Sequence, residues 1–321
     1  MKKNNGNPMQ YINFNQKYEK EIVELWNKCC TFDPITLTKF RNQALYDDNF
    51  NTDLCFIALD NQKVVGFILA TKRIFPYLER GLEETRGWIN VLFVDKEYRN
   101  QQIGEHLYKL AENKLKEMGV KEITLAAYSP NYFFSGIDEV NYYEASQFFK
   151  KQGYIASNLH YSMGRKLFGF KYTNEIINKK KIIEEKGYKF INFKNEYSIE
   201  LLEFLKKEFG GGWKRNALMS MRNQTAEEII LLVLDKDNKI CGFSMSAIDG
   251  NPMRFGPIGI AKEKRNEGLG SILLQYSFEQ LEKRGIHYIF FMTTDEPGKR
   301  YYGRNGFEVI RTFTEYRKVI N

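Results

Sequence analysis

The stretch that decides the fold reads Arg265-Asn266-Glu267-Gly268-Leu269-Gly270-Ser271. It lies between an apolar, strand-like segment at residues 256–261 and an amphipathic segment that stops at Gly285. Glycines lack a Cβ, so successive backbone N–H groups can turn toward one anion, and a helix N-terminus adds its own unpaired N–H groups. The pattern predicts a pyrophosphate-binding loop at the start of a helix. Short Gly-x-Gly turns also occur for packing alone, so the assignment of an anion-binding loop depends on the rest of the sequence.

The same layout occurs twice along the chain, which predicts two homologous domains. The loop at residue 265 has a counterpart that reads Arg99-Asn100-Gln101-Gln102-Ile103-Gly104. Polar turns at residues 60–62 and 237–238 each precede an apolar strand, as in a β-hairpin. We therefore expect a first domain at residues 1–170, a linker helix at residues 171–186 and a second domain at residues 187–321.

The order of elements, with the closing motif Tyr302-Gly303-Arg304-Asn305-Gly306-Phe307, resembles the GCN5-related N-acetyltransferases over nearly the whole chain. The resemblance implies an α/β fold with a mixed sheet. Two such domains would stand in tandem, each with a central, mostly antiparallel sheet, one splayed pair of strands and flanking helices. It also implies acetyl-CoA as the acetyl donor. Within the superfamily, residues 132–138, 255–257 and 293–295 resemble the two-domain glucosamine/glucosaminide N-acetyltransferases.

Composition narrows the functional classes further. The chain has 321 residues and a formal net charge of +8, but its dense basic run, Lys179 to Lys181, is followed by Glu184 and Glu185. This pattern is typical of a solvated helix, so we expect no nucleic-acid partner. No apolar run is long enough for a signal peptide or a membrane span, so a cytoplasmic protein is expected. Four cysteines and three histidines show no metal-ligand spacing, and no metal is expected. No particular oligomeric state is predicted.

The two halves differ at positions that matter for chemistry. The second half keeps both loop glycines, whereas the first has Gln102 in place of the earlier one and Phe149 in place of Tyr302. We expect the first domain to be catalytically degenerate. A second cofactor site there would involve Val94, Arg99, Gln102, Ile103 and Gly104. An insertion at residues 130–141 is interpreted either as a surface loop or as the wall of an acceptor pocket.

By the resemblance, the second half supplies the chemistry. Backbone N–H groups of Ile258, Gly259 and Ile260 would hold the thioester and the pantetheine arm where the strand bulges away from its neighbour. A glycine in a strand also serves packing alone. Residues 265–271 would hold the pyrophosphate. Tyr302 would protonate the leaving thiolate, with Tyr301 as its rival.

The general base and the acceptor site remain open between alternatives. Asp295 is the first candidate for the base, although its place before Pro297 also fits a helix cap. Asp249 is the second candidate, and turn chemistry alone would explain it. Trp213, after three glycines, is a candidate sugar platform or a core residue.

The expected function is transfer of acetyl from acetyl-CoA directly to an amino sugar, such as the glucosamine end of a cell-wall or chitosan fragment. The alternatives are an aminoglycoside, polyamine or peptide amine as acceptor, or a non-catalytic acyl-CoA-binding module.

Overall fold

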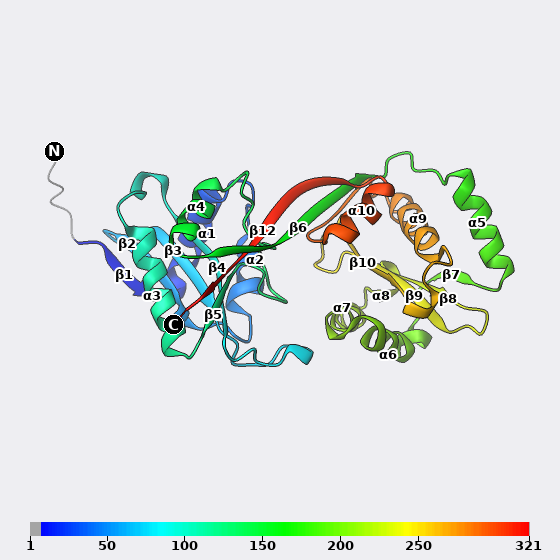
Figure 1. Ribbon diagram of the computed structural model, residues 1–321, viewed down its shortest axis with the longest axis horizontal. Helices are drawn as coiled ribbons and strands as arrows, with labels where there is room; N and C mark the ends of the chain where they lie inside the picture. The colour runs from blue at the N-terminus through cyan, green and yellow to red at the C-terminus, as the bar shows by residue number, and fades with distance from the viewer. Residues whose placement is uncertain (1–7, 321) are drawn as a thin grey trace. The chain divides into compact units, whose positions relative to one another are not determined.

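The computed structural model describes residues 8–320 and forms two compact units. Unit 1 combines the chain up to His160 with the segment that begins at Arg311, and unit 2 comprises Tyr161–Ile310. Each unit is a mixed α/β structure with its own sheet and helices, as the sequence predicts (Figure 1). Within residues 8–320, every helix is too short or too polar to span a membrane.

Unit 1 is built on strands in the order β1-β2-β3-β4-β5-β12, of which β4 and β5 are parallel and the other pairs antiparallel. Its elements are β1 (Gln10–Asn13), α1 (Glu19–Cys29), α2 (Leu37–Phe40), β2 (Cys55–Asp60), β3 (Lys63–Thr71), β4 (Arg86–Val94), α3 (Ile103–Glu117), β5 (Glu122–Leu125), α4 (Tyr143–Lys151), the start of β6 (Ile155–Lys166) and most of β12 (Glu308–Val319).

The sheet of unit 1 is buried on both faces, with a separate hydrophobic cluster on each. Successive residues of a strand point to opposite faces, so neighbouring residues belong to different clusters. Ile57 and Phe67 pack in the cluster that contains Trp26 of α1, whereas Ala58 and Ile68 pack in the cluster that contains Leu107 of α3. The helices α1 and α3 therefore cover opposite faces. Both predicted hairpins are confirmed, here as β2 and β3 and in unit 2 as β8 and β9.

Unit 2 contains a four-stranded antiparallel sheet in the order β10-β9-β8-β7. Its elements are α5 (Asn174–Glu185), β7 (Lys189–Asn192), α6 (Ser198–Phe209), α7 (Gly211–Arg222), α8 (Ala226–Ile229), β8 (Ile230–Leu234), β9 (Ile240–Ser246), β10 (Phe255–Ile260), α9 (Leu269–Lys283), β11 (Tyr288–Phe291) and α10 (Glu296–Arg304).

Alternation along β8 sets the layers of unit 2. Leu231 packs in a cluster with Ile272 of α9, whereas Leu232 packs in a cluster with Leu201 of α6. Figure 1 accordingly shows α9 on one side of this sheet and α6 with α7 on the other. The helix expected at residues 171–186 is present as α5, and the hydroxyl of Tyr172 just before it donates to Glu279 of α9 at 3.1 Å.

Each unit contains a strand from beyond the domain limits that the sequence predicts. The last strand, β12, pairs with β5 of unit 1, with Arg317 opposite Thr124. The end of β6 pairs with β11 of unit 2, with Met163 opposite Phe291. A single cut at residue 170 does not separate these units, because residues 311–320 belong to the first. The expected domain limits at residues 170 and 187 mark the ends of the sequence repeat, and they stay a prediction.

Candidate functional site

The glycine-rich loop of unit 2 has the geometry of an anion cradle. Asn266 (φ +69°) and Gly268 (φ +86°) are left-handed, and α9 begins directly afterwards at Leu269. No described side chain caps this helix, so its first N–H groups face outward from the loop. A Cβ added to Gly270 would lie 3.6 Å from Ile260 Cγ1, an ordinary contact. The protein's own packing therefore does not require a glycine there.

The loop of unit 1 follows the same backbone path. Asn100 (φ +59°) and Gln102 (φ +64°) are left-handed, and α3 begins at Ile103. Arg99 Nε donates to the carbonyl of Val94 at 3.3 Å, just as Arg265 Nε donates to that of Ile260 at 3.2 Å. One difference between the two loops is the side chain of Gln102, held in a conformation that favours glycine.

Glu267 places a carboxylate inside the unit 2 loop, and a neighbouring tyrosine binds it. The hydroxyl of Tyr188 donates to Glu267 Oε2 at 2.8 Å. This contact orients the carboxylate toward Tyr188. Ser271 lies in the first turn of α9, in the region where a helix attracts anions.

The strand before each loop bulges and separates from its parallel neighbour. In unit 2, β10 shifts register against β9 between Phe255 and Ile258, and it meets the β11 segment through a single parallel bridge, Arg254 with Phe290. In unit 1, β4 and β5 stay paired from Arg86 to Ile89 and then part. The bulge and the splayed pair that the resemblance implies are both confirmed. The use of N–H groups of Ile258 to Ile260 to bind a ligand stays a prediction.

Gly259 has a packing reason of its own. A Cβ at this position would come within 2.5 Å of the Phe209 ring. That ring stacks on Trp213, with ring centroids 4.7 Å apart, and Trp213 also contacts Phe243 at 5.5 Å. Trp213 is thus part of an aromatic group at the ends of α6 and α7, which favours the core interpretation over an open sugar platform.

Two adjacent tyrosines on α10 approach the site differently. Tyr302 packs against Phe291 of β11, with ring centroids 4.5 Å apart, and burial raises the pKa of its hydroxyl above the usual value. Tyr301 has its hydroxyl 3.6 Å from the position of a Cβ on Gly270, and burial raises its pKa to about 12. Both hydroxyls therefore stay protonated at neutral pH, as a general acid requires.

The carboxylate candidates are both exposed and both engaged in local structure. Asp295 is the N-cap of α10, and its Oδ1 accepts from the Gly298 N–H at 2.9 Å. Asp249 accepts from the Asn251 N–H at 3.1 Å within its turn, and its Oδ2 lies 3.9 Å from Arg254 Nε. The cap and the turn are thus present, and a role as base for either residue stays a prediction.

Sequence reasoning missed a cavity in unit 1 at the point where β4 and β5 part. It has a volume of about 90 Å³, and its walls are mainly apolar. Asn90, Phe149 and Phe313 line it, and so do Phe134 and Ile137 from the insertion. The insertion at residues 130–141 therefore walls a pocket. Its aromatic composition carried that signal, but no pattern pointed to Asn90.

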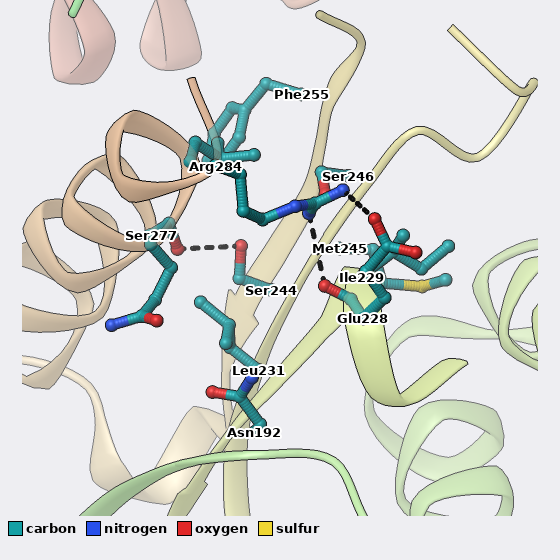
Figure 2. Close-up of a pocket in the computed structure, with 12 residues that line it drawn as sticks. Asn192, Glu228, Ile229, Leu231, Ser244, Met245, Ser246, Phe255, Ser277 and Arg284 are labelled. Atoms are coloured by element: carbon teal, nitrogen blue, oxygen red, sulfur yellow. Dashed lines mark hydrogen bonds and ion pairs between the residues drawn. The ribbon is translucent and has the colours of Figure 1, made fainter. Parts of the chain in front are cut away.

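A second cavity lies in unit 2 between α9 and the sheet (Figure 2). It measures about 30 Å³, room for roughly two water molecules. Ser277 of α9 and Ser244 of β9 point toward each other across it, 3.0 Å apart, and Arg284 contacts Glu228 at its rim (Figure 2). None of the predicted loop or catalytic residues lines this cavity, which is too small for a substrate. Within residues 8–320, no group of three or more His, Cys, Asp or Glu side chains is arranged to hold a metal ion.

Family models match both halves of the chain. Residues 19–133 match the acetyltransferase (GNAT) family and residues 227–309 match an acetyltransferase (GNAT) domain. Among curated proteins, N-alpha-acetyltransferase 30 of Dictyostelium discoideum is 35% identical over 92 residues, which are 29% of this chain and 44% of that protein. The Schizosaccharomyces pombe protein of the same name is 28% identical over 114 residues, 36% of this chain and 69% of that protein. The chain thus spans less than half the length of the Dictyostelium relative.

Solved structures share the fold across both units. The GCN5-related glucosamine N-acetyltransferase region of a fungal multi-domain GH3 β-N-acetylglucosaminidase matches 97% of this chain and 38% of that chain, with a TM-score of 0.79 and 17% identity. A tandem GNAT protein from the clavulanic acid biosynthesis pathway matches 97% of this chain and 98% of that chain, with a TM-score of 0.65 and 12% identity. At these identities the likeness is one of fold.

Proposed function

This chain consists of two GNAT acetyltransferase domains in tandem, and we propose that it transfers the acetyl group of acetyl-CoA to the primary amine of an amino sugar. The acceptor would be glucosamine or the glucosaminide end of a cell-wall or chitosan fragment, and the reaction would take place in the cytoplasm. The observation that carries the proposal is the loop of unit 2. Its left-handed Gly268 and its Gly270, which packing does not require, stand beside a bulged strand that parts from its neighbour.

In this proposal, two segments of unit 2 bind different parts of acetyl-CoA. N–H groups in the loop from Arg265 to Ser271 would hold the pyrophosphate at the N-terminus of α9. N–H groups of Ile258, Gly259 and Ile260 would bind the pantetheine arm and the thioester carbonyl, whose oxygen gains negative charge as the amine attacks.

The proton transfers would involve Tyr302 of α10 and Asp295, the N-cap of the same helix. Asp295 would take a proton from the acceptor ammonium, directly or through water, with the carboxylate oxygen that does not cap the helix. The neutral amine attacks the thioester carbon, the C–S bond breaks, and Tyr302 gives its proton to the thiolate. The amine nitrogen, which is positively charged after the attack, loses its second proton to the Tyr302 oxygen, directly or through water. The products are an N-acetyl amine and CoA.

Direct transfer is favoured over an acyl-enzyme by the state of Cys241. This thiol is buried, its Sγ lies 3.5 Å from the Val233 carbonyl oxygen, and burial raises its pKa to about 12. It is therefore protonated at neutral pH, and a thiol is a poor nucleophile compared with a thiolate.

An amino-sugar acceptor is supported by the glucosamine N-acetyltransferase region whose fold this chain shares over 97% of its length. A peptide amine is the second candidate, because the curated relatives with which this chain shares 35% and 28% identity are N-alpha-acetyltransferases. A polyamine or aminoglycoside acceptor and a non-catalytic acyl-CoA-binding module remain as alternatives.

The rate of CoA release from acetyl-CoA separates these functions. We would compare glucosamine, a chitobiose-type fragment, a peptide with a free N-terminal amine and a polyamine at equal concentration. We expect turnover with the amino sugars and none with the others. Faster turnover with the peptide than with the amino sugars would contradict the amino-sugar proposal and favour a peptide acceptor. Binding of acetyl-CoA without turnover of any amine would favour a non-catalytic binding module.

A further inference from the structure

Arg254 lies just before the point where β10 and β11 part. The segment proposed to bind the thioester, Ile258 to Ile260, follows it along β10, and the glycine-rich loop comes after that segment. The pyrophosphate would therefore lie beyond one end of the thioester, and Arg254 lies beyond the other. At about 3.3 Å per strand residue, Arg254 is at most about 13 Å from Ile258. An acceptor that enters from the end opposite to the pyrophosphate would pass Arg254.

Arg254 and the helix that begins at the loop belong to opposite faces of the sheet. Phe255, the next residue, packs in the cluster that contains Phe278 of α9, and successive strand residues point to opposite faces. Ala247, whose N–H donates to the Arg254 carbonyl at 2.7 Å, packs against the cluster that contains Leu201 of α6. The side chain of Arg254 is thus on the α6 face, away from the face that α9 covers.

The guanidinium of Arg254 is buried with little compensation for its charge. Only 10% of the side chain is exposed, and its Nη1 is buried without a hydrogen-bond partner among residues 8–320. In that part of the chain, Asp249 is the one carboxylate that approaches it, with Oδ2 3.9 Å from Nε, and 53% of the Asp249 side chain is exposed. An ion pair this long with an exposed partner stabilises little, whereas a buried charge without hydrogen bonds is costly. A second oxyanion would satisfy the Nη1 edge.

Unit 1 places a guanidinium at the same location from another position in the sequence. Trp88 of β4 and Arg254 have the same register relative to their neighbouring strands. Arg73 packs on the Trp88 ring, with its Cζ 4.8 Å from the ring centroid. Its side chain is fully buried, and Glu83 accepts from its Nε at 3.0 Å. Both units therefore keep a positive charge beside the strand that splays, although the residue that supplies it differs. Arg73 is enclosed, whereas the exposed carboxylate beside Arg254 leaves one side of that site open to solvent.

We propose that the acceptor of unit 2 carries an acidic group and that Arg254 binds this group through its Nη1 edge. The inference rests on the function proposed above and narrows its acceptor to an amino sugar with a carboxylate or a phosphate ester. A guanidinium binds two oxygens of either group through parallel N–H donors. Arg254 binds and orients the acceptor in this proposal and takes no part in the proton transfers.

Initial rates of CoA release with related amino sugars test the proposal. Muramic acid, which is glucosamine with a carboxylate-bearing ether, and glucosamine 6-phosphate are each compared with glucosamine. We expect kcat/KM to be about tenfold higher or more for one of the acidic sugars, mainly through a lower KM, because a charged hydrogen bond is gained. Preference for muramic acid would identify a carboxylate, and preference for the phosphate ester would identify a phosphate. Equal or lower kcat/KM for both acidic sugars would overturn the proposal.

Substitution of Arg254 tests whether this residue causes the preference. Arg254→Gln should lower kcat/KM for the preferred acidic sugar about tenfold and leave that for glucosamine nearly unchanged. Arg284→Gln is the matched control, because Arg284 binds Glu228 at the rim of the small cavity of unit 2 and should change neither value (Figure 2). Arg254→Lys keeps the charge and should retain part of the preference, in case the Gln variant misfolds. Equal losses for acidic and neutral sugars would mean that Arg254 has a structural role only.

A matched pair of peptides separates failure of this inference from failure of the proposed function. The peptides have a free N-terminal amine and differ only in an Asp or an Ala as the second residue. Turnover of the acidic peptide alone, lost in Arg254→Gln, would overturn the amino-sugar acceptor and keep the role of Arg254. Turnover of sugars without any preference for acidic ones would do the reverse. If no amine turns over, calorimetric titration of the acetyl-CoA-saturated chain with muramic acid, glucosamine 6-phosphate and glucosamine compares their Kd values, and equal values would overturn the inference.

Discussion

Gly104 and Gly270 have nearly identical surroundings in the protein. A Cβ on Gly104 would lie 3.6 Å from Val94 Cγ2, and one on Gly270 would lie 3.6 Å from Ile260 Cγ1. Both are the second residue of a 15-residue helix, α3 or α9. The cost of a larger side chain to folding should therefore be similar at the two positions, and any difference in activity must come from the ligand.

This similarity makes the two glycines a matched pair of sites. Gly270→Val should lower kcat/KM for acetyl-CoA by about one to three orders of magnitude, because the side chain would enter the space that we propose for the pyrophosphate in unit 2. Gly104→Val should change kcat/KM much less. Initial rates of CoA release measure both, with thermal unfolding as the control for folding. Equal losses would mean that both units take part in turnover.

A second residue-scale prediction concerns the proton donor. Tyr302→Phe should lower kcat by about one to three orders of magnitude, because a lost general acid typically costs about 10²- to 10⁴-fold and water recovers part of that. Tyr301→Phe is the matched control on the same helix and should retain most of the activity. Single-turnover rates with acetyl-CoA compare the two. A larger loss in Tyr301→Phe would make the residue nearest Gly270 the acid.

At the scale of elements, the alternation of strand residues and the glycines that end the helices were predictable from local sequence. α3 and α9 end just before Gly119 (φ +81°) and Gly285 (φ +77°), as expected from the left-handed residue that terminates many helices. The strands that follow these helices, β5 and β11, are shorter than the strand-like segments at residues 120–127 and 286–293. Only the middle residues of each segment pair with a neighbouring strand. Length of pairing depends on neighbours that are remote in sequence.

The pairing of β6 with β12 contains a buried carboxylate. Glu315 accepts from Arg317 Nε at 2.6 Å and from the hydroxyl of Ser157 at 3.1 Å, and His160 Nε2 lies 3.5 Å away. His160, with help from Arg317 and Ser157, holds the pKa of Glu315 at about 2 despite burial. A folded-state pKa below the unfolded value means that the ionised form stabilises the fold at neutral pH.

The sign of this shift predicts a specific acid dependence. Glu315→Gln should lower the free energy of unfolding by about 1 to 3 kcal/mol near neutral pH, because it weakens charged hydrogen bonds. The difference from the unaltered chain should shrink as pH falls from about 4.5 toward 2, where Glu315 itself takes a proton. Urea unfolding at several pH values measures it. A difference that stays constant down to pH 2 would contradict the assignment.

At the scale of the whole molecule, the two halves of the sequence do not coincide with the two compact units. Tyr316 and Ile320, near the end of the chain, are buried in the same cluster as Leu107 and Tyr154 of the first half. Met163, within the expected first domain at residues 1–170, is buried with Phe291 and Phe307. Unit 1 therefore needs a strand from the end of the given sequence, and unit 2 includes the end of β6.

This exchange predicts the behaviour of a truncated chain. Residues 1–170 alone lack β12, so the edge of β5 and the apolar surface around Tyr154 would be exposed to water. We expect this fragment to aggregate or to unfold without a cooperative transition, as measured by circular dichroism during heating. The full chain is the control. A sharp, reversible transition of the fragment would mean that residues 1–170 form an independent domain.

Much of the candidate site was predictable, because its residues are close together in sequence. The loop from Arg265 to Ser271, the bulged strand before it and the tyrosine on α10 follow from local pattern and from resemblance to a family. The sequence allowed two roles each for Asp295 and Trp213: helix cap or general base for Asp295, and core residue or sugar platform for Trp213. For these two, local patterns allow both a structural and a functional role, and only the contacts show the structural one.

The sequence by itself determined the repeat, the α/β class, the family and the position of the glycine-rich loop, because these depend on spacing and residue type within short segments. The tertiary structure decided which strands complete each unit, since β6 and β12 pair with partners that no local pattern specifies. It also decided that the first unit contains an apolar cavity with Asn90 at its edge. A cavity is the space left between side chains from distant segments, so it exists only once the chain has folded.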